Sequence, residues 1–198
     1  MEPEENTKNM IIESSITLFY RKGYKGTSVA DIASECDITA AAIYYHFKNK
    51  DHILWACYER LIEELDRKIV QEVWKAASPE ERLEKLITTI FDLWFERPEL
   101  ALLQSDPIAP LTEGRDVQYK QHRENWYKFV ASLITDLSGS FKSNAEVEIC
   151  AFLLSKSLSY PEIIFSGDDY RVISGTKRKQ ILKVLKKFYM QALLGKTF

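Results

Sequence analysis

Residues 27–50 read TSVADIASECDITAAAIYYHFKNK, and this stretch predicts two short helices, a tight turn between them, and the start of a third helix. Ser28 and Asp31 form a capping-box pattern, in which each residue satisfies a free N–H group at the start of the first helix. Thr39 can cap the second helix, and residues 36–38 make the turn. The stretch therefore has the order of a helix-turn-helix unit.

The second of these helices, predicted over residues 40–47, has two unlike faces. Ala40 and Ile43 are predicted to pack inward, because they recur at helical spacing. Tyr44 and Tyr45 lie on the other face and are predicted to point to solvent. A short capped helix with exposed aromatic side chains and flanking lysines suits the major groove of DNA. Similar shapes also serve as plain packing units, so this stretch alone leaves both interpretations open.

The wider sequence resembles the tetracycline-repressor (TetR) family of transcription factors over residues 8–58, about a quarter of the chain. The matching signals are IIESSITLFYRKGYKGTSV at residues 11–29, Asp31-Ile32-Ala33, Ile43-Tyr44-Tyr45-His46-Phe47, and Lys50 where the family has a lysine opening its fourth helix. The resemblance implies a homodimeric transcription factor, usually a repressor, that a small ligand releases from its operator.

The same resemblance implies which residues contact DNA. Ser28, Tyr44 and Lys50 match contacts to the phosphate backbone, and Thr39 and Tyr45 are among the positions that match the groove-facing ones. With their neighbours they make the predicted DNA-binding set, which is Thr27, Ser28, Thr39, Ala40, Ala41, Tyr44, Tyr45, His46 and Lys50.

The chain departs from the family's pattern at residues 40–42, which are all alanine, where many members place glycine, serine, threonine or a longer polar residue. Alanine can touch a thymine methyl group, but it cannot hydrogen-bond a base edge. We therefore expect specificity to come from Thr39, Tyr45 and the shape of the DNA.

Charge limits how the predicted DNA contact can work. The 198-residue chain has a net charge of −2, and residues 6–50 carry six Lys or Arg and four Asp or Glu. This small local excess excludes a general basic coat for nucleic acid. Affinity is expected instead from a dimer that binds two palindromic half-sites of double-stranded operator DNA.

The N-terminus and the cysteines indicate the compartment. MEPEENTK lacks the features of a signal peptide, no apolar run reaches membrane-spanning length, and a cytoplasmic protein without membrane contact is expected. Residues 1–5 are predicted to be disordered. Cys36, Cys57 and Cys150 are predicted to be free thiols, and a redox-sensing role for them is left open.

The remaining chain has helical periodicity and no strand signals, so the predicted fold class is all-α. Helices are expected at residues 7–22, 49–74, 79–96 (capped by Ser78), 100–104 (opened by Pro98-Glu99), 115–138, 144–165 (capped by Asn144 and kinked at Pro161) and 176–194. The predicted domains are a three-helix DNA-binding head at residues 1–48 and a helical ligand-binding and dimerisation bundle at residues 49–198. In the resembled family the helix at 49–74 is the lever between them.

Aromatic side chains recur along the helices of the bundle, and most of them are expected to be ordinary core. A few are predicted to line a pocket for a largely apolar effector, such as an acyl thioester or an aromatic compound, with Arg97, Arg115 and Arg123 near its mouth to bind an acidic group. The predicted ligand-binding residues are Phe91, Trp94, Phe95, Arg97, Arg123, Trp126, Phe129, Phe152 and Tyr160.

The last helix has two adjacent apolar stripes, which is typical of a helix that packs on its own core and on another protomer. Leu182, Tyr189 and Leu193 form one stripe. The residues predicted at the homodimer interface are Leu153, Ile181, Leu185, Phe188 and Ala192.

Catalytic constellations are not found in the sequence. His46, His52 and His122 do not form the H-E-x-x-H pattern, and no glycine-rich phosphate loop occurs. The chain is therefore predicted not to be an enzyme and to hold no metal or cofactor. Two alternatives remain: a DNA-binding protein of the same fold controlled by a protein partner rather than a small-molecule inducer, and an all-α enzyme or lipid carrier. The identity of the effector, the operator sequence, and activation or repression are not decided at this point.

Overall fold

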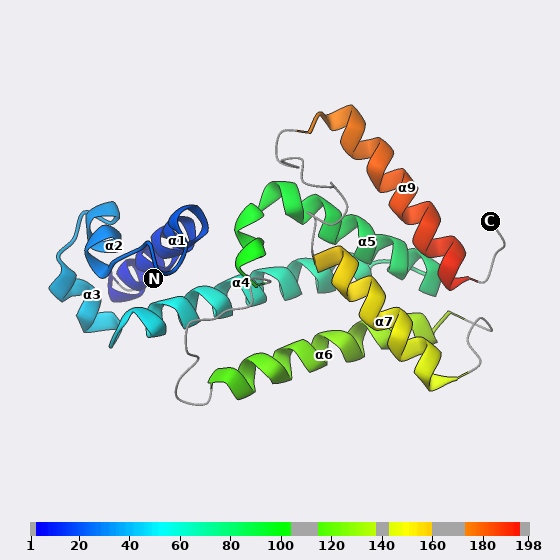
Figure 1. Ribbon diagram of the computed structural model, residues 1–198, viewed down its shortest axis with the longest axis horizontal. Coiled ribbons are helices and arrows are strands. Elements are labelled where there is room, and N and C mark those ends of the chain that lie inside the picture. Colours follow the sequence, from blue (N-terminus) through cyan, green and yellow to red (C-terminus); the bar gives the residue numbers. More distant parts are fainter. Residues whose placement is uncertain (1–2, 104–114, 138–142, 160–172, 195–198) are drawn as a thin grey trace. The chain divides into compact units, whose positions relative to one another are not determined.

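The computed structural model of the chain describes residues 3–103, 115–137, 143–159 and 173–194. Every regular element in these ranges is a helix, which confirms the predicted all-α fold (Figure 1). The elements are α1 (Pro3–Lys22), α2 (Val29–Glu35), α3 (Ala40–His46), α4 (Lys50–Val73), α5 (Pro79–Glu96), the 3-10 helix η1 (Pro98–Leu103), α6 (Arg115–Thr135), α7 (Asn144–Ser159) and α9 (Gly175–Leu193).

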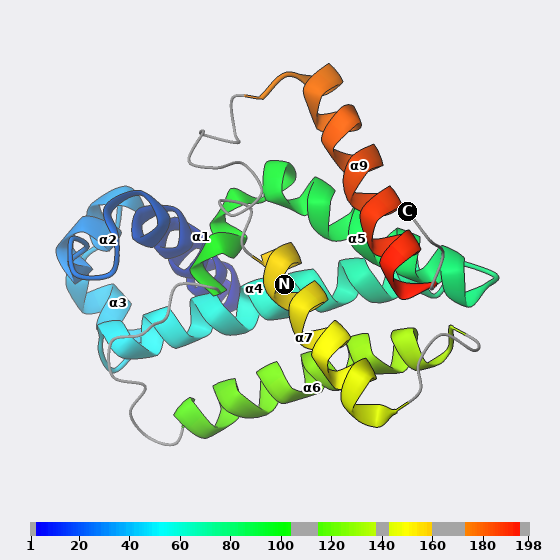
Figure 2. The ribbon, with the colours of Figure 1, turned by 45° about the vertical axis from the view of Figure 1, so that its right-hand side comes forward.

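These helices form two compact units. The first contains the described residues up to Leu65 and those within 99–116, and the second contains those within 66–98 and from 117 onward. In the first unit α2 packs against α1 and α3, and in the second α5 packs against α9 and α7 (Figure 2). The boundary falls inside α4, so this helix contributes residues to both units. The functional division at residue 48 stays a prediction.

The first helix begins earlier than the sequence analysis predicted. Pro3 is its first residue, and Glu4 and Glu5 lie in its first turn. Proline lacks only an N–H group that would have no helical partner there, and acidic side chains interact favourably with the positive end of the helix dipole. The predicted disorder is therefore wrong for residues 3–5.

Two glycines shape the loop between α1 and α2. Gly23 has a φ of +72°, and its N–H group donates to the Phe19 carbonyl oxygen at 2.9 Å, so it ends α1 in a conformation that favours glycine. At Gly26 a Cβ atom would lie 2.3 Å from the Lys22 carbonyl oxygen. Gly26 therefore lies where the loop backbone passes too close to the end of α1 for a larger residue.

The N-terminal half of α4 is attached to α1 by side-chain contacts. Arg60 donates to the Glu13 Oε1 atom at 3.3 Å and also to the Asn9 side chain. The buried Cys57 thiol lies 3.6 Å from the Ile12 carbonyl oxygen. These contacts fix the N-terminal half of α4 to α1, against which α2 also packs.

Of the two helix caps predicted in the second unit, one is confirmed and one is wrong. Ser78 accepts from the Glu81 N–H group at 3.1 Å and opens α5. The predicted cap of α7 is wrong, because Asn144 is already helical and the Ser143 hydroxyl oxygen accepts from the Glu146 N–H group at 3.3 Å. A short hydroxyl side chain directly before a helix can accept from a free N–H group of the first turn, so Ser143 is the cap. The predicted extension of α7 to residue 165 and the kink at Pro161 lie outside the described residues.

Candidate DNA-binding site

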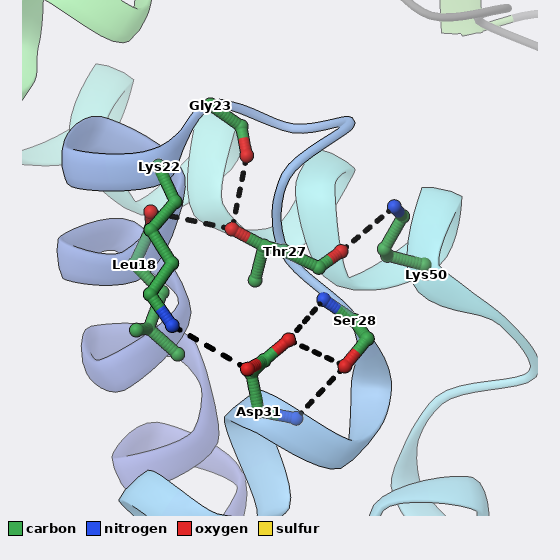
Figure 3. Close-up of polar contacts among 7 residues, drawn as sticks. All are labelled: Leu18, Lys22, Gly23, Thr27, Ser28, Asp31 and Lys50. Carbon is green, nitrogen blue, oxygen red and sulfur yellow. Dashed lines mark hydrogen bonds and ion pairs between the residues drawn. The ribbon is translucent and has the colours of Figure 1, made fainter.

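A capping box opens α2 as predicted (Figure 3). The Ser28 hydroxyl oxygen accepts from the Asp31 N–H group at 3.0 Å, and the Asp31 carboxylate accepts from the Ser28 N–H group at 2.8 Å. Hydrogen bonds from Ser28, and then an ion pair with Lys22 at 3.4 Å, lower the pKa of Asp31 to about 2. The carboxylate therefore stays charged at the positive end of the α2 dipole throughout the neutral range.

Thr27 lies inside the head rather than on its surface. Its side chain is 1% exposed, and its hydroxyl group donates to the carbonyl oxygens of Gly23 at 2.9 Å and Leu18 at 3.3 Å (Figure 3). Any part that Thr27 plays in DNA binding is therefore indirect, through the position of the loop before α2.

Lys50, the first residue of α4, holds the same loop from the other side. Its ammonium group donates to the carbonyl oxygens of Thr27 at 2.8 Å and Tyr24 at 2.9 Å (Figure 3 shows the bond to Thr27). It also lies 4.1 Å from the centroid of the Tyr24 ring. An ammonium group has three donors, so one donor is left after these two bonds.

Tyr24 completes this contact between the loop and α4. Its hydroxyl group donates to the Asp51 carboxylate. Burial and the hydrogen bond to Asp51 raise the pKa of Tyr24, so the phenol keeps its proton and the bond at neutral pH. The loop before α2 is thus tied to the start of α4 through both Lys50 and Tyr24.

The helix α3 is short but firmly placed. The Thr39 hydroxyl oxygen caps it by accepting from the Ala42 N–H group at 3.2 Å, and Ile43 and Phe47 are buried at its inner side. Ala40, which was predicted to pack inward, is exposed. Ala40 follows the cap directly, and only the side chains one and two turns later reach the core, so the predicted inner face is one residue too long.

The outer side of α3 presents the two tyrosines. Tyr44 is 55% exposed and Tyr45 is 72% exposed, as the sequence predicted. The Tyr45 hydroxyl group donates to the Glu4 Oε1 atom at 3.0 Å, and its ring meets the half-buried His46 ring edge to face, with 5.1 Å between the centroids. Three other residues of the predicted DNA-binding set are also exposed, namely Ser28, Thr39 and Ala41.

These features define a helix-turn-helix DNA-binding domain. The helix α3 is capped and anchored, and it presents polar and aromatic groups to solvent. The loop before α2 is held by Lys50 at the start of α4. Residues 11–57 match the family described as bacterial regulatory proteins, tetR family. Residues 11–57 therefore carry the DNA-binding domain of this family.

The sequence relatives carry names of the same kind. YuxN of Bacillus subtilis (strain 168), named as an uncharacterized HTH-type transcriptional regulator, is 26% identical over 156 residues, which cover 78% of this chain and 54% of YuxN. YerO of the same organism, also named as an uncharacterized HTH-type transcriptional regulator, is 35% identical over 106 residues, which cover 52% of this chain and 37% of YerO. The chain therefore matches about half or less of these two relatives. The HTH-type transcriptional repressor KstR2 of Rhodococcus jostii (strain RHA1) is 23% identical, with 88% of this chain and 87% of KstR2 covered.

Solved structures share the fold. AibR in complex with isovaleryl coenzyme A and operator DNA has a TM-score of 0.78 and 20% identity, with 92% of this chain and 97% of that chain covered. The ketosteroid transcriptional regulator KstR2 of Mycobacterium tuberculosis has a TM-score of 0.74 and 17% identity, with 93% of each chain covered.

The predicted ligand-binding residues of α5 have different surroundings. Phe91 and Trp94 are buried, with their ring centroids 5.4 Å apart. The indole N–H group of Trp94 donates to the Leu158 carbonyl oxygen at 2.9 Å, so this side chain joins α5 to α7 as part of the core. Phe95 is half-buried, and the Arg178 guanidinium group lies 3.7 Å from the centroid of its ring.

On α6 the predicted residues are less deeply placed. Arg123, Trp126 and Phe129 are half-buried, and an Arg123 nitrogen donates to the Tyr127 hydroxyl oxygen at 3.1 Å. This hydrogen bond raises the pKa of Arg123, so the group remains a cation. Arg97 is half-buried. Tyr160 lies outside the described residues.

The last helix has one buried face and one exposed face. Tyr189 and Leu193 are buried, and the Tyr189 hydroxyl group donates to the Ser157 hydroxyl oxygen on α7. Phe188, on the predicted interface, is 50% exposed. The remaining predicted interface residues are either half-buried (Ile181 and Leu185) or exposed (Ala192 and Leu153).

Three further observations concern features other than DNA binding. Burial raises the pKa of the Cys57 thiol, and it also raises that of the half-buried Cys150 thiol, so neither has the thiolate character of a reactive cysteine. Among the described residues, no group of three or more His, Cys, Asp or Glu side chains is placed to hold a metal ion. None of the helices in these ranges combines the length and hydropathy that a membrane span requires.

Proposed function

We propose that this regulator is a dimeric repressor that binds a palindromic operator and leaves it when a largely apolar small molecule binds the second unit. The observation that carries the DNA-binding part is α3, whose exposed Tyr44 and Tyr45 stand on a helix anchored by Ile43 and Phe47. Repression is supported by the name of KstR2 as a transcriptional repressor and of IcaR of Staphylococcus epidermidis as a negative transcriptional regulator.

The dimer is supported by large apolar side chains exposed on α7 and α9 of the second unit. Phe188 and Val184 on α9, and Ile149, Phe152 and Leu153 on α7, are large apolar side chains that are at least half exposed. Such a surface is costly in water and marks a contact between proteins. We assign it to a second copy of this chain, because two half-sites of a palindrome require two identical heads.

A mutation pair tests the DNA-binding site. Tyr44→Ala is expected to weaken binding by roughly the same factor on every sequence, because phosphate contacts position a protein without specifying bases. Tyr45→Ala is expected to relax the base preference as well. The measurement is fluorescence anisotropy with the operator and with a scrambled duplex over a range of salt concentrations, where each phosphate contact contributes about 0.9 to the slope of log K against log salt. Wild-type binding by both variants would show that α3 is not the reading helix.

The effector is proposed to be apolar with an acidic group, as in an acyl thioester. The half-buried aromatic side chains of α6 and the cationic Arg123 beside them support this class, and AibR was solved with isovaleryl coenzyme A. Because α4 carries residues of both units, a change in its direction would move the head. Release then requires the effector to bind the DNA-free form better, and DNA must weaken effector binding by the same factor.

Native mass spectrometry followed by a melting-temperature screen tests the effector. A dimer with a retained mass of a few hundred daltons or more would support the pocket and give the mass of the compound. At about 100 times its Kd an effector should stabilise the protein by about 2.7 kcal/mol. Arg123→Gln is expected to reduce the melting-temperature shift caused by acyl thioesters but not that caused by neutral apolar compounds. If no apolar compound raised the melting temperature, control by a protein partner would replace this proposal.

A further inference from the structure

The first turn of α1 reaches the exposed tip of α3. The Tyr45 hydroxyl group donates to the Glu4 Oε1 atom at 3.0 Å, although the two residues are 41 positions apart in the sequence. Both lie in the first compact unit. Glu4 follows Pro3, with which α1 begins, so its backbone is held by the helix and its carboxylate stands beside the most exposed aromatic side chain of α3.

This contact determines which hydrogen-bonding group Tyr45 offers to DNA. A phenol hydroxyl has one proton to donate, and its oxygen can also accept. Because the proton is directed to Glu4, only the accepting lone pairs of Tyr45 remain for a third partner. The hydrogen bond and the negative charge of Glu4 raise the pKa of Tyr45, so the hydroxyl keeps this proton at neutral pH. The ionised carboxylate of Glu4 is an acceptor only.

We propose that Glu4 is a positioning residue for base recognition, which makes Tyr45 a hydrogen-bond acceptor and biases the contacted base toward adenine or cytosine. In the major groove, adenine and cytosine present exocyclic amino groups that donate, whereas guanine and thymine present acceptors at the corresponding edge. A tyrosine whose proton is already used can bond the first two bases and is repelled by the others. This inference rests on the proposed function, which places Tyr45 in the groove.

The carboxylate has a second consequence. Glu4 adds a negative charge close to the phosphate backbone, which weakens binding to all sequences through electrostatic repulsion. Removing Glu4 should therefore raise the affinity for nonspecific DNA. It should also lower the ratio of the affinity for a good operator to the affinity for a poor one. A residue that merely stabilised the fold would not change these two quantities in opposite directions.

The experiment compares base preference in three variants. Tyr45→Phe, tested on operators with each base at each position, identifies the position that the hydroxyl group contacts. At that position the wild-type protein is expected to bind adenine or cytosine about fivefold more tightly than guanine or thymine, as one net hydrogen bond implies. Glu4→Ala should reduce this preference to within about twofold. Glu5→Ala, which removes the same charge from the next residue of the same turn, should leave the preference unchanged.

An NMR titration of the free protein checks the contact without DNA. The Tyr45 ring carbon signal should report a raised pKa in the wild-type protein and in Glu5→Ala, and a value nearer to that of an ordinary tyrosine in Glu4→Ala. If Glu4→Ala kept the wild-type base preference, the positioning role would be overturned even where the titration showed the contact. If Tyr45→Phe changed no position, the placement of Tyr45 in the groove would fail, and the inference would fail with it.

Discussion

A protein carrying Phe188→Glu is expected to be a monomer and to bind a palindromic operator at least about 100-fold more weakly than the wild type. Phe188 is 50% exposed on the outer face of α9, next to the exposed Val184. A carboxylate placed at the centre of an apolar interface would lose its hydration without gaining a partner, which costs several kcal/mol. Loss of the dimer also removes the gain from binding two half-sites together, which can reach a factor of about 10² to 10⁴.

The measurement combines native mass spectrometry with operator binding, and Val117→Glu is the matched control. Val117 is 63% exposed on α6, so the same substitution there adds the same charge outside the predicted interface. The control is expected to stay dimeric and to bind like the wild type. Circular dichroism should show equal helix content in both variants, because Phe188 is not part of the buried core. If Phe188→Glu stayed dimeric with wild-type affinity, the second copy would have to bind through another surface.

The parts of the site that were predictable from sequence are those governed by neighbours three or four residues apart. Ser28 and Asp31 satisfy each other's backbone groups within one turn, and Thr39 caps α3 in the same way. The exposed tyrosines and the buried Ile43 follow from helical periodicity. Local geometry decides all of these features, so no knowledge of the rest of the fold was needed.

The parts that could not be predicted depend on where α1 lies relative to α3 and α4. The bond between Glu4 and Tyr45 requires α1 to start at Pro3, and the two bonds from Lys50 require the loop at residues 24–27 to lie across the first turn of α4. The burial of Thr27 has the same origin. Periodicity gives the face on which a residue lies, but it does not give the partner that the tertiary fold brings to that face.

The α5 and α6 residues show a further limit. Aromatic residues at helical spacing were expected to be partly core and partly pocket, and the pattern did not separate the two groups. Trp94 proves to be core, because its N–H group is used by the Leu158 carbonyl oxygen of a neighbouring helix. Such a bond spans 64 positions and has no signature in the sequence of either helix.

Lys50→Met is expected to lower both the stability of the head and its affinity for DNA. The Lys50 ammonium group bonds two carbonyl oxygens, those of Tyr24 and Thr27, and hydrogen bonds to charged groups contribute about 1.5–3 kcal/mol each. Because the site is partly exposed and water can replace one bond, we expect a loss of about 2 kcal/mol in the free energy of unfolding. Methionine keeps an apolar chain beside the Tyr24 ring and isolates the effect of the ammonium group.

The effect on DNA follows from the third donor of the same group. Without the ammonium group of Lys50, we expect each protomer to lose one phosphate contact, and the loop before Ser28 to lose two hydrogen bonds. We therefore expect DNA binding to weaken at least about tenfold on all sequences. The salt slope should fall by about 0.9 per protomer. Lys25→Met, at an exposed lysine of the same loop, removes an equal charge and is expected to leave stability unchanged. If Lys50→Met weakened DNA binding but not stability, the two bonds to carbonyl oxygens would contribute nothing to the stability of the head. If the variant lost stability but kept the wild-type salt slope, Lys50 would hold the loop without contacting phosphate.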